Sequence, residues 1–206
     1  LALKPTTGMC GMKADCGGAA ALLGAFEAAV AIGTRGTALH CLLCLAENAI
    51  GPAAVRNDDI IRSLSGKTIE INNSDAEGRL VLADGVAHAT ALPPRLPGLG
   101  AGAQPDLILD MATLTGAQLV ATGKRHGAVV SSSGELEAAA VAAGLISGAV
   151  AHPLPSPPEW FMKEVQAAVA GQKNSVKDRR NSGAPRAAPL TPLALHQPVA
   201  VRVRHP

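Results

Sequence analysis

The alternation of apolar and polar positions divides the chain into short helices and strands. Apolar or Ala-rich runs with helical spacing are expected to form helices at residues 16–33, 77–92, 134–146 and 158–170. Apolar runs that suit strands are found at residues 37–47, 67–71, 106–112 and 127–133. Strands that alternate with helices in this way predict an α/β fold, with a mixed, largely parallel sheet sandwiched by helices.

Composition narrows the class of protein. With 206 residues, 48% of them hydrophobic, the chain is long enough to bury one sizeable core. The net charge of +2 is too small to indicate a nucleic-acid or membrane surface. No apolar run is expected to reach the length of a membrane span, and no secretory signal is apparent. Four cysteines do not make a dense disulfide framework, so we expect a reducing compartment and a cytoplasmic protein. The charge and the apolar run lengths indicate no membrane partner.

Two of the cysteines, Cys41 and Cys44, have the C-x-x-C spacing that is found in redox and metal sites. No second pair follows them, and they fall within an expected buried strand, where positions three apart face opposite ways. Core packing is therefore favoured over metal or redox chemistry.

The end of the chain differs in character from the rest. From about Gln172 basic residues and prolines accumulate and apolar periodicity is lost. We expect a domain over residues 1–182 and an irregular, basic, Pro-rich tail over residues 183–206. A nucleic-acid contact through this tail is a weaker hypothesis, because no aromatic residue is interleaved with the charges.

The stretch "NNSDAEGRL", residues 72–80, places two carboxylates and a guanidinium within five positions, at Asp75, Glu77 and Arg79. One interpretation is an exposed polar turn. The other is an extended segment, in which residues i, i+2 and i+4 project from one side and the carboxylates share a divalent cation. The spacing alone leaves both interpretations open.

The longer stretch "NNSDAEGRLVLADGV" closely resembles the signature of the leucyl (cytosol) aminopeptidase family, with Ser74 in place of the usual Thr. "LALKPTTGMCGMKADCGGAA", "CLAENAIGPAAVRNDDI" and "DMATLTGAQ" are similar to other segments of that family and occur in the expected order. The resemblance covers roughly residues 1–182 and is strongest to the branch called probable aminopeptidase-like. It implies the catalytic domain of the leucyl aminopeptidase type, here incomplete.

The resemblance also implies a chemistry: removal of N-terminal residues from peptides by a hydroxide that bridges two divalent metal ions, Zn or Mn, with Mg also compatible. The matched metal ligands are Asp15, Asp75 and Glu77. Lys4 matches a catalytic lysine that polarises the scissile carbonyl, and Arg79 an arginine that holds bicarbonate. The matched substrate-binding residues are Met12, Asn73, Thr113, Leu114 and Gly116.

Two departures from the family pattern bear on activity. The chain begins just after the positions where the family supplies a further lysine ligand and a bridging aspartate, so it looks truncated at its N-terminus. Its last residues, from Ala184, do not follow the family and look altered. The main hypothesis is thus a metalloaminopeptidase that, at full length, forms the family's homo-hexamer and acts on peptides. The alternative is a non-catalytic truncated subunit or assembly partner.

Overall fold

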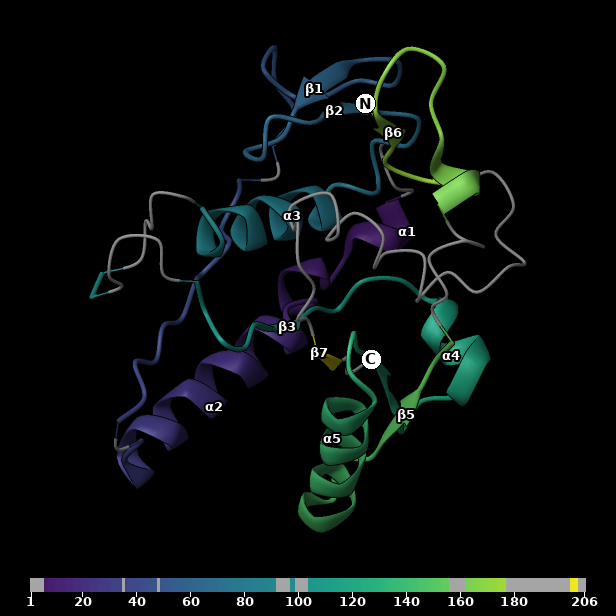
Figure 1. Ribbon diagram of the computed structural model, residues 1–206. Coiled ribbons are helices and arrows are strands. Elements are labelled where there is room, and N and C mark those ends of the chain that lie inside the picture. Colours follow the sequence, from purple (N-terminus) through teal and green to yellow (C-terminus); the bar gives the residue numbers. More distant parts are fainter. Residues whose placement is uncertain are drawn as a thin grey trace.

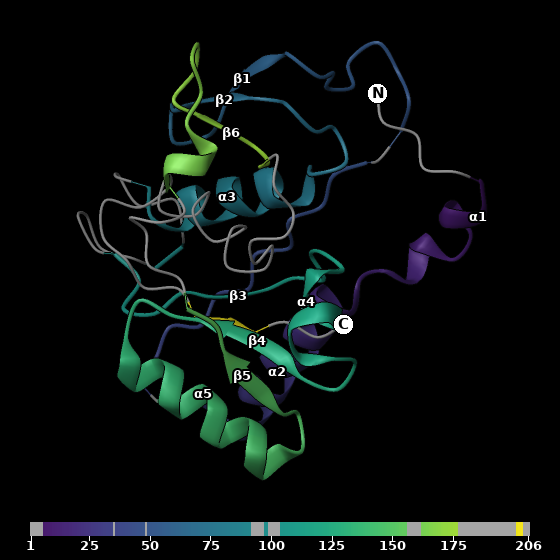
Figure 2. The same ribbon diagram turned by 90° about the vertical axis from the view of Figure 1, so that its right-hand side faces the viewer.

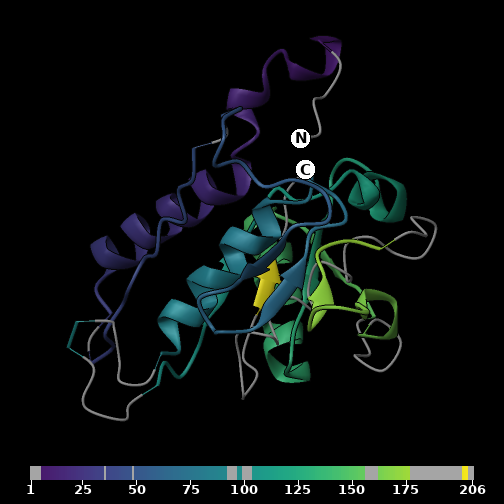
Figure 3. The same ribbon diagram turned by 90° about the horizontal axis from the view of Figure 1, so that it is seen from above.

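The computed structural model describes residues 6–34, 36–47, 49–91, 97–98, 104–155, 162–176 and 201–203. Its elements form layers: a small sheet, the helix α3, a larger sheet, and then the helices α2 and α5 (Figures 1 and 2). Seen from above, α2 runs outward from the rest of the molecule (Figure 3). The expected mixed α/β fold is confirmed.

The larger sheet has parallel and antiparallel pairs. Its strands lie in the order β3 (Leu109–Met111), β7 (Val201–Val203), β4 (Gly127–Val130) and β5 (Ala151–Pro153). β3 pairs with β7 and β4 with β5 in parallel, whereas β4 and β7 are antiparallel. β4 is the most buried of these strands for which side chains are described, and Val129 is completely buried.

Two long helices pack on this sheet. α2 (Gly17–Ile32) contacts β3, and α5 (Gly134–Ser147) contacts β4, β5 and β7. α2 approaches the strand closely: a Cβ on Gly18 would lie 2.7 Å from main-chain atoms of Ala112, so only glycine fits there. α5 begins at an N-cap, where the Ser133 side chain accepts from the Leu136 amide at 3.4 Å.

The small sheet is built from β1 (Ile60–Arg62), β2 (Thr68–Glu70) and β6 (Gln172–Lys173). β1 and β2 form an antiparallel hairpin, and β6 pairs with β2 in parallel from far along the chain. Ile69 and Ile71 are buried here, and the helix α3 (Gly78–Ala89) follows β2 after a short loop. The sequence between β2 and α3 is the one that carries the acidic residues.

Shorter helical turns complete the described chain. They are α1 (Thr6–Met9), η1 (Met12–Ala14), α4 (Ala117–Thr122) and η2 (Met162–Val165). The stretch Thr7–Ile32, which includes η1 and α2, is long and apolar enough by length and composition to cross a membrane, whereas no apolar run of that length was expected. It is weak support for a span, because Lys13 and Asp15 interrupt it and the 16 residues of α2 reach only about 24 Å.

Four other sequence expectations need correction. Residues 37–47 form no strand, since their main chain pairs with no strand in the described part of the chain. The helix expected at residues 158–170 is reduced to η2 in its described part, residues 162–170. Most of the tail, residues 183–200 and 204–206, lies outside the described residues, but residues 201–203 are not irregular, because they form β7 between β3 and β4. The acidic stretch is not extended, as shown next.

Candidate active site

The acidic loop, residues 72–77, is a tight turn that leads from β2 into α3. Asn73 organises it: its side chain accepts from the Asp75 amide at 3.0 Å, and its main-chain oxygen accepts from the Ala76 amide at 3.2 Å. Asn57 fixes the loop from outside by accepting from the Ser74 amide at 3.1 Å. These are the local bonds that Asn residues make in turns.

This geometry corrects the expectation that three charged residues project from one side of an extended segment. Glu77 already has helical angles, φ −81 and ψ −37, as the residue before α3. Arg79 lies in the first turn of α3 and is only 9% exposed, whereas Asp75 and Glu77 are exposed. The carboxylates therefore face solvent while the arginine side chain enters the protein, since a helix turns successive residues by about 100° rather than 180°.

Asn174, just after β6, contacts the loop from across the fold. Its Oδ1 accepts from the amides of Asn72 and Asn73, at 3.0 and 3.2 Å. Its Nδ2 donates to the main-chain oxygens of Asn73 and Ala76, at 2.7 and 3.4 Å. Its own main-chain oxygen accepts from Arg79 Nη1 at 3.2 Å. Sequence reasoning did not identify Asn174, although it lies in "KNSVK", within the range of the family resemblance.

Ser175 adds a second connection between the same two segments. The Asn72 side chain donates from Nδ2 to the Ser175 main-chain oxygen at 3.0 Å and accepts the Ser175 amide at 2.9 Å. This pair of bonds extends the parallel pairing of β2 with β6 by means of a side chain. The start of the acidic loop is therefore held against the chain that follows β6.

The segments that carry Asp15 and Thr113 also meet. Asp15 ends η1 just before α2, and the Gly18 amide at the start of α2 donates to Thr113 Oγ1 at 3.0 Å. Thr113 follows β3, so the close approach of α2 to β3 brings together two segments that are almost a hundred residues apart in sequence.

The remaining residues implied by the resemblance are distributed over these segments. Met12 lies in η1 with 39% of its surface exposed, and Leu114 is half-buried after β3. Gly116 is the residue before α4. Lys4 lies outside the described residues, so the structure does not place it.

The carboxylates match a divalent metal by chemistry but do not form a closed set. Asp15, Asp75 and Glu77 all offer exposed oxygen ligands of the kind that Mg²⁺, Mn²⁺ and Zn²⁺ accept. In the part of the chain that the structure describes, however, no three His, Cys, Asp or Glu residues come together as a metal-binding group. The expected convergence of these three carboxylates is thus not seen in this chain, and their role as ligands stays a proposal.

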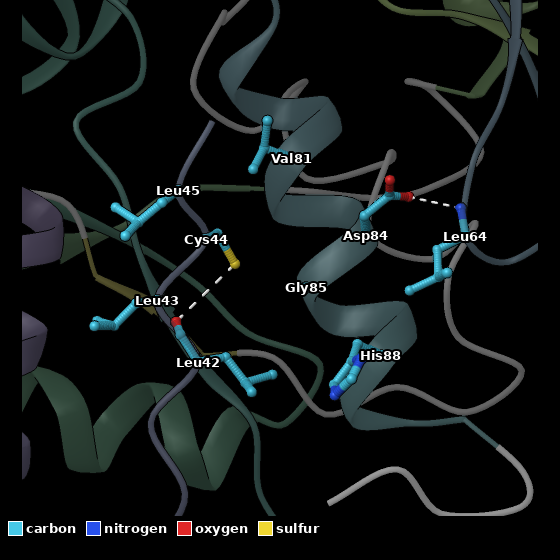
Figure 4. Close-up of a pocket in the computed structure, with 9 residues that line it drawn as sticks. All are labelled: Leu42, Leu43, Cys44, Leu45, Leu64, Val81, Asp84, Gly85 and His88. Atoms are coloured by element: carbon cyan, nitrogen blue, oxygen red, sulfur yellow. Dashed lines mark hydrogen bonds between the residues drawn. The ribbon is translucent and has the colours of Figure 1, made fainter. Parts of the chain in front are cut away.

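Cys44, the second cysteine of the C-x-x-C pair, lies elsewhere, beside α3. Cys44 lines a pocket of about 340 Å³ between residues 42–45 and α3, where Asp84 and His88 are also found (Figure 4). A Cβ on Gly85 would collide with the Cys44 sulfur unless that side chain turned away. Burial, with the nearby carboxylates of Asp110 and Asp84, raises the pKa of the Cys44 thiol. All four cysteines are free, and a raised pKa disfavours the reactive thiolate.

Comparison with known proteins identifies the family to which the chain is similar. A family model described as the cytosol aminopeptidase family, catalytic domain, matches residues 1–193, slightly beyond the boundary expected at residue 182. The human protein named probable aminopeptidase NPEPL1 is 57% identical over 182 residues, which are 88% of this chain and 33% of that protein. The chain thus spans about a third of the length of the curated relatives it matches.

Solved structures show the same relationship. The apo structure of leucyl aminopeptidase from Trypanosoma cruzi superimposes with a TM-score of 0.88 at 45% identity, over 98% of this chain and 38% of that one. The bottromycin maturation enzyme BotP in complex with Mn superimposes with a TM-score of 0.79 at 31% identity, over 98% of this chain and 42% of that one. On sequence and fold together, the chain belongs to the cytosol aminopeptidase family and corresponds to part of its catalytic domain.

Proposed function

We propose that this chain is part of the catalytic domain of a metal-dependent aminopeptidase, which removes N-terminal residues from peptides. The observation that carries the proposal is the acidic loop, whose two exposed carboxylates project from a turn that buried contacts hold in place. A turn that served only to connect β2 to α3 would not need two acids separated by one residue and followed by a buried arginine. Membership of the aminopeptidase family supports the same conclusion.

In this proposal Asp15, Asp75 and Glu77 hold divalent ions, together with ligands from the rest of the protein. Mn²⁺ is the first candidate, because a similar structure is a complex with Mn. Bound ions of this kind activate water near neutral pH and polarise a peptide carbonyl. Zn²⁺ and Mg²⁺ suit the same oxygen ligands.

The other residues have roles in binding and charge stabilisation. Lys4 supplies a cation where negative charge develops on the carbonyl oxygen of the substrate. Arg79 is the residue that would hold bicarbonate, and its Nη1 also donates to the main-chain oxygen of Asn174. The side chain of the first substrate residue rests against Met12, and the substrate backbone contacts Asn73, Thr113, Leu114 and Gly116.

The proposal includes a setting for the whole protein. The matched family is described as cytosol aminopeptidases, so a cytosolic location is expected. A homo-oligomer, the hexamer that the resemblance implies, is the expected assembly at full length.

The test uses the full-length protein and an aminoacyl-amide substrate, with added Mn²⁺ or Zn²⁺. Wild type is compared with Asp75→Asn and with Asp106→Asn. The second variant removes an exposed carboxylate that precedes β3, at the end of the strand opposite to Thr113. We expect metal-dependent cleavage by wild type and by Asp106→Asn, and a loss of at least about 100-fold in Asp75→Asn, because a lost ligand costs more than a lost supporting contact. A stable full-length protein that cleaves nothing with any of these ions would favour the non-catalytic alternative.

A further inference from the structure

Asn174 uses the whole hydrogen-bonding capacity of its side chain on the acidic loop. Its Oδ1 accepts two main-chain amides at the start of the loop, and its Nδ2 donates to two main-chain oxygens, one of them on Ala76 near the end. A side-chain amide has two acceptor and two donor positions, so all four are occupied. With N–H groups on one side and carbonyls on the other, the amide fits in only one orientation.

The main chain of Asn174 fastens the same region to its surroundings. Its amide donates to the Glu70 oxygen in β2 at 3.0 Å, and its oxygen accepts from Arg79 in α3. The residue is only 1% exposed, so water cannot readily replace these partners. One residue thus ties together the end of β2, both ends of the loop and the first turn of α3.

We infer that Asn174 is a positioning residue for the carboxylates of Asp75 and Glu77, an inference that rests on the function proposed above. Asp75 lies within the stretch that Asn174 spans, between Asn73 and Ala76, and Glu77 follows directly. Without contacts that hold it, an exposed loop of this kind is free to open. The four hydrogen bonds oppose that opening and keep the carboxylates aimed for a divalent ion.

Chemistry predicts how two substitutions differ. Asn174→Ala removes all four side-chain bonds. Asn174→Asp is nearly the same shape and keeps an oxygen for the Asn72 and Asn73 amides, but its second oxygen faces the carbonyls of Asn73 and Ala76 and cannot donate to them when ionised. The aspartate variant should therefore hold the start of the loop and release its end.

The matched control is Thr68→Val. Thr68 Oγ1 accepts from the Gly171 amide at 2.9 Å, which is a bond between the same two segments, β2 and the chain around β6, but away from the loop. Valine keeps the branched shape and removes that bond. A general weakening of the small sheet would appear in this variant, whereas a loss of loop position would not.

The experiment measures two quantities in full-length wild type and the three variants. Hydrogen exchange of residues 72–77 is followed without metal, and Mn²⁺ binding is measured by calorimetry. We expect fast exchange across the loop and Mn²⁺ binding weaker by about 10- to 100-fold in Asn174→Ala, the range seen when supporting contacts of metal ligands are lost. Asn174→Asp should retain protection from exchange at Asn72 and Asn73, and its Mn²⁺ affinity should lie between those of wild type and Asn174→Ala. Thr68→Val should match wild type in exchange and in Mn²⁺ affinity.

The outcomes separate this inference from the proposed function. Slow exchange of the loop in Asn174→Ala, or wild-type Mn²⁺ affinity despite fast exchange, would overturn the inference. So would equal losses of Mn²⁺ affinity in Asn174→Ala and Thr68→Val. A wild-type protein that binds none of Mn²⁺, Zn²⁺ and Mg²⁺ would instead overturn the proposed function, and this inference with it.

Discussion

Arg79 Nη1 donates to the main-chain oxygen of Asn174 at 3.2 Å, although 95 residues separate the two. This bond, together with the four made by the Asn174 side chain, joins the acidic loop to the chain after β6. The arginine of the family signature is therefore part of the structural support of the loop as well as a candidate anion-binding group.

Replacing Arg79 should destabilise the protein. Arg79→Ala leaves the Asn174 oxygen without this donor in a buried place, which we expect to cost about 1–3 kcal/mol of unfolding free energy. Arg56→Ala is the matched control, since Arg56 is exposed and donates to the Pro52 oxygen at a long 3.4 Å. That variant should stay within about 0.5 kcal/mol of wild type. Urea denaturation of the full-length variants measures both, and equal stabilities would show that the bond to Asn174 contributes nothing.

Two glycines of α2 should respond oppositely to alanine. Gly18→Ala brings a Cβ to 2.7 Å from the Ala112 main chain and should cost about 1–3 kcal/mol, because the helix must move off β3. Gly24→Ala meets nothing within 4 Å and should stabilise the helix by about 0.5–1 kcal/mol. Thermal unfolding of the two variants is the measurement. A neutral Gly18→Ala would mean that α2 does not approach β3 this closely.

The raised pKa of Cys44 predicts slow alkylation. Iodoacetamide reacts with thiolates, so at pH 8 Cys44 should react more slowly than Cys10 because its pKa is raised, although both residues are exposed. The raised pKa also makes stability depend on pH. When the pH rises above the ordinary thiol pKa, the Cys44 thiol of the unfolded chain loses its proton before that of the folded chain. The Cys44 thiol therefore lowers the free energy of unfolding at high pH. Mass spectrometry of timed samples measures the rates. Faster labelling of Cys44 would contradict the packing against α3.

Local pattern predicted the parts of the fold that depend on local sequence. α2, α3 and α5 were predicted because helical periodicity and end signals lie within each segment. β2 and β3 were predicted from short apolar runs. The strand expected at residues 37–47 was wrong, because apolar character does not specify a partner strand.

The site depended on contacts that no local pattern contains. β6 has two residues and no alternation, so neither it nor Asn174 could be identified by periodicity. The burial of Arg79 follows from its position in α3 and from a partner far along the chain. The closeness of Asp75 and Glu77 was visible in the sequence. The extended geometry assumed for them was wrong, because α3 begins directly after Glu77.

The most direct test of the account is a crystal structure of the full-length protein grown with Mn²⁺, with the ions located by anomalous scattering. The account predicts anomalous peaks in contact with the carboxylates of Asp75, Glu77 and Asp15, in front of the loop that Asn174 holds. Mn²⁺ bound only at other residues, or well-ordered carboxylates of Asp75 and Glu77 with no ion between them at saturating Mn²⁺, would contradict it.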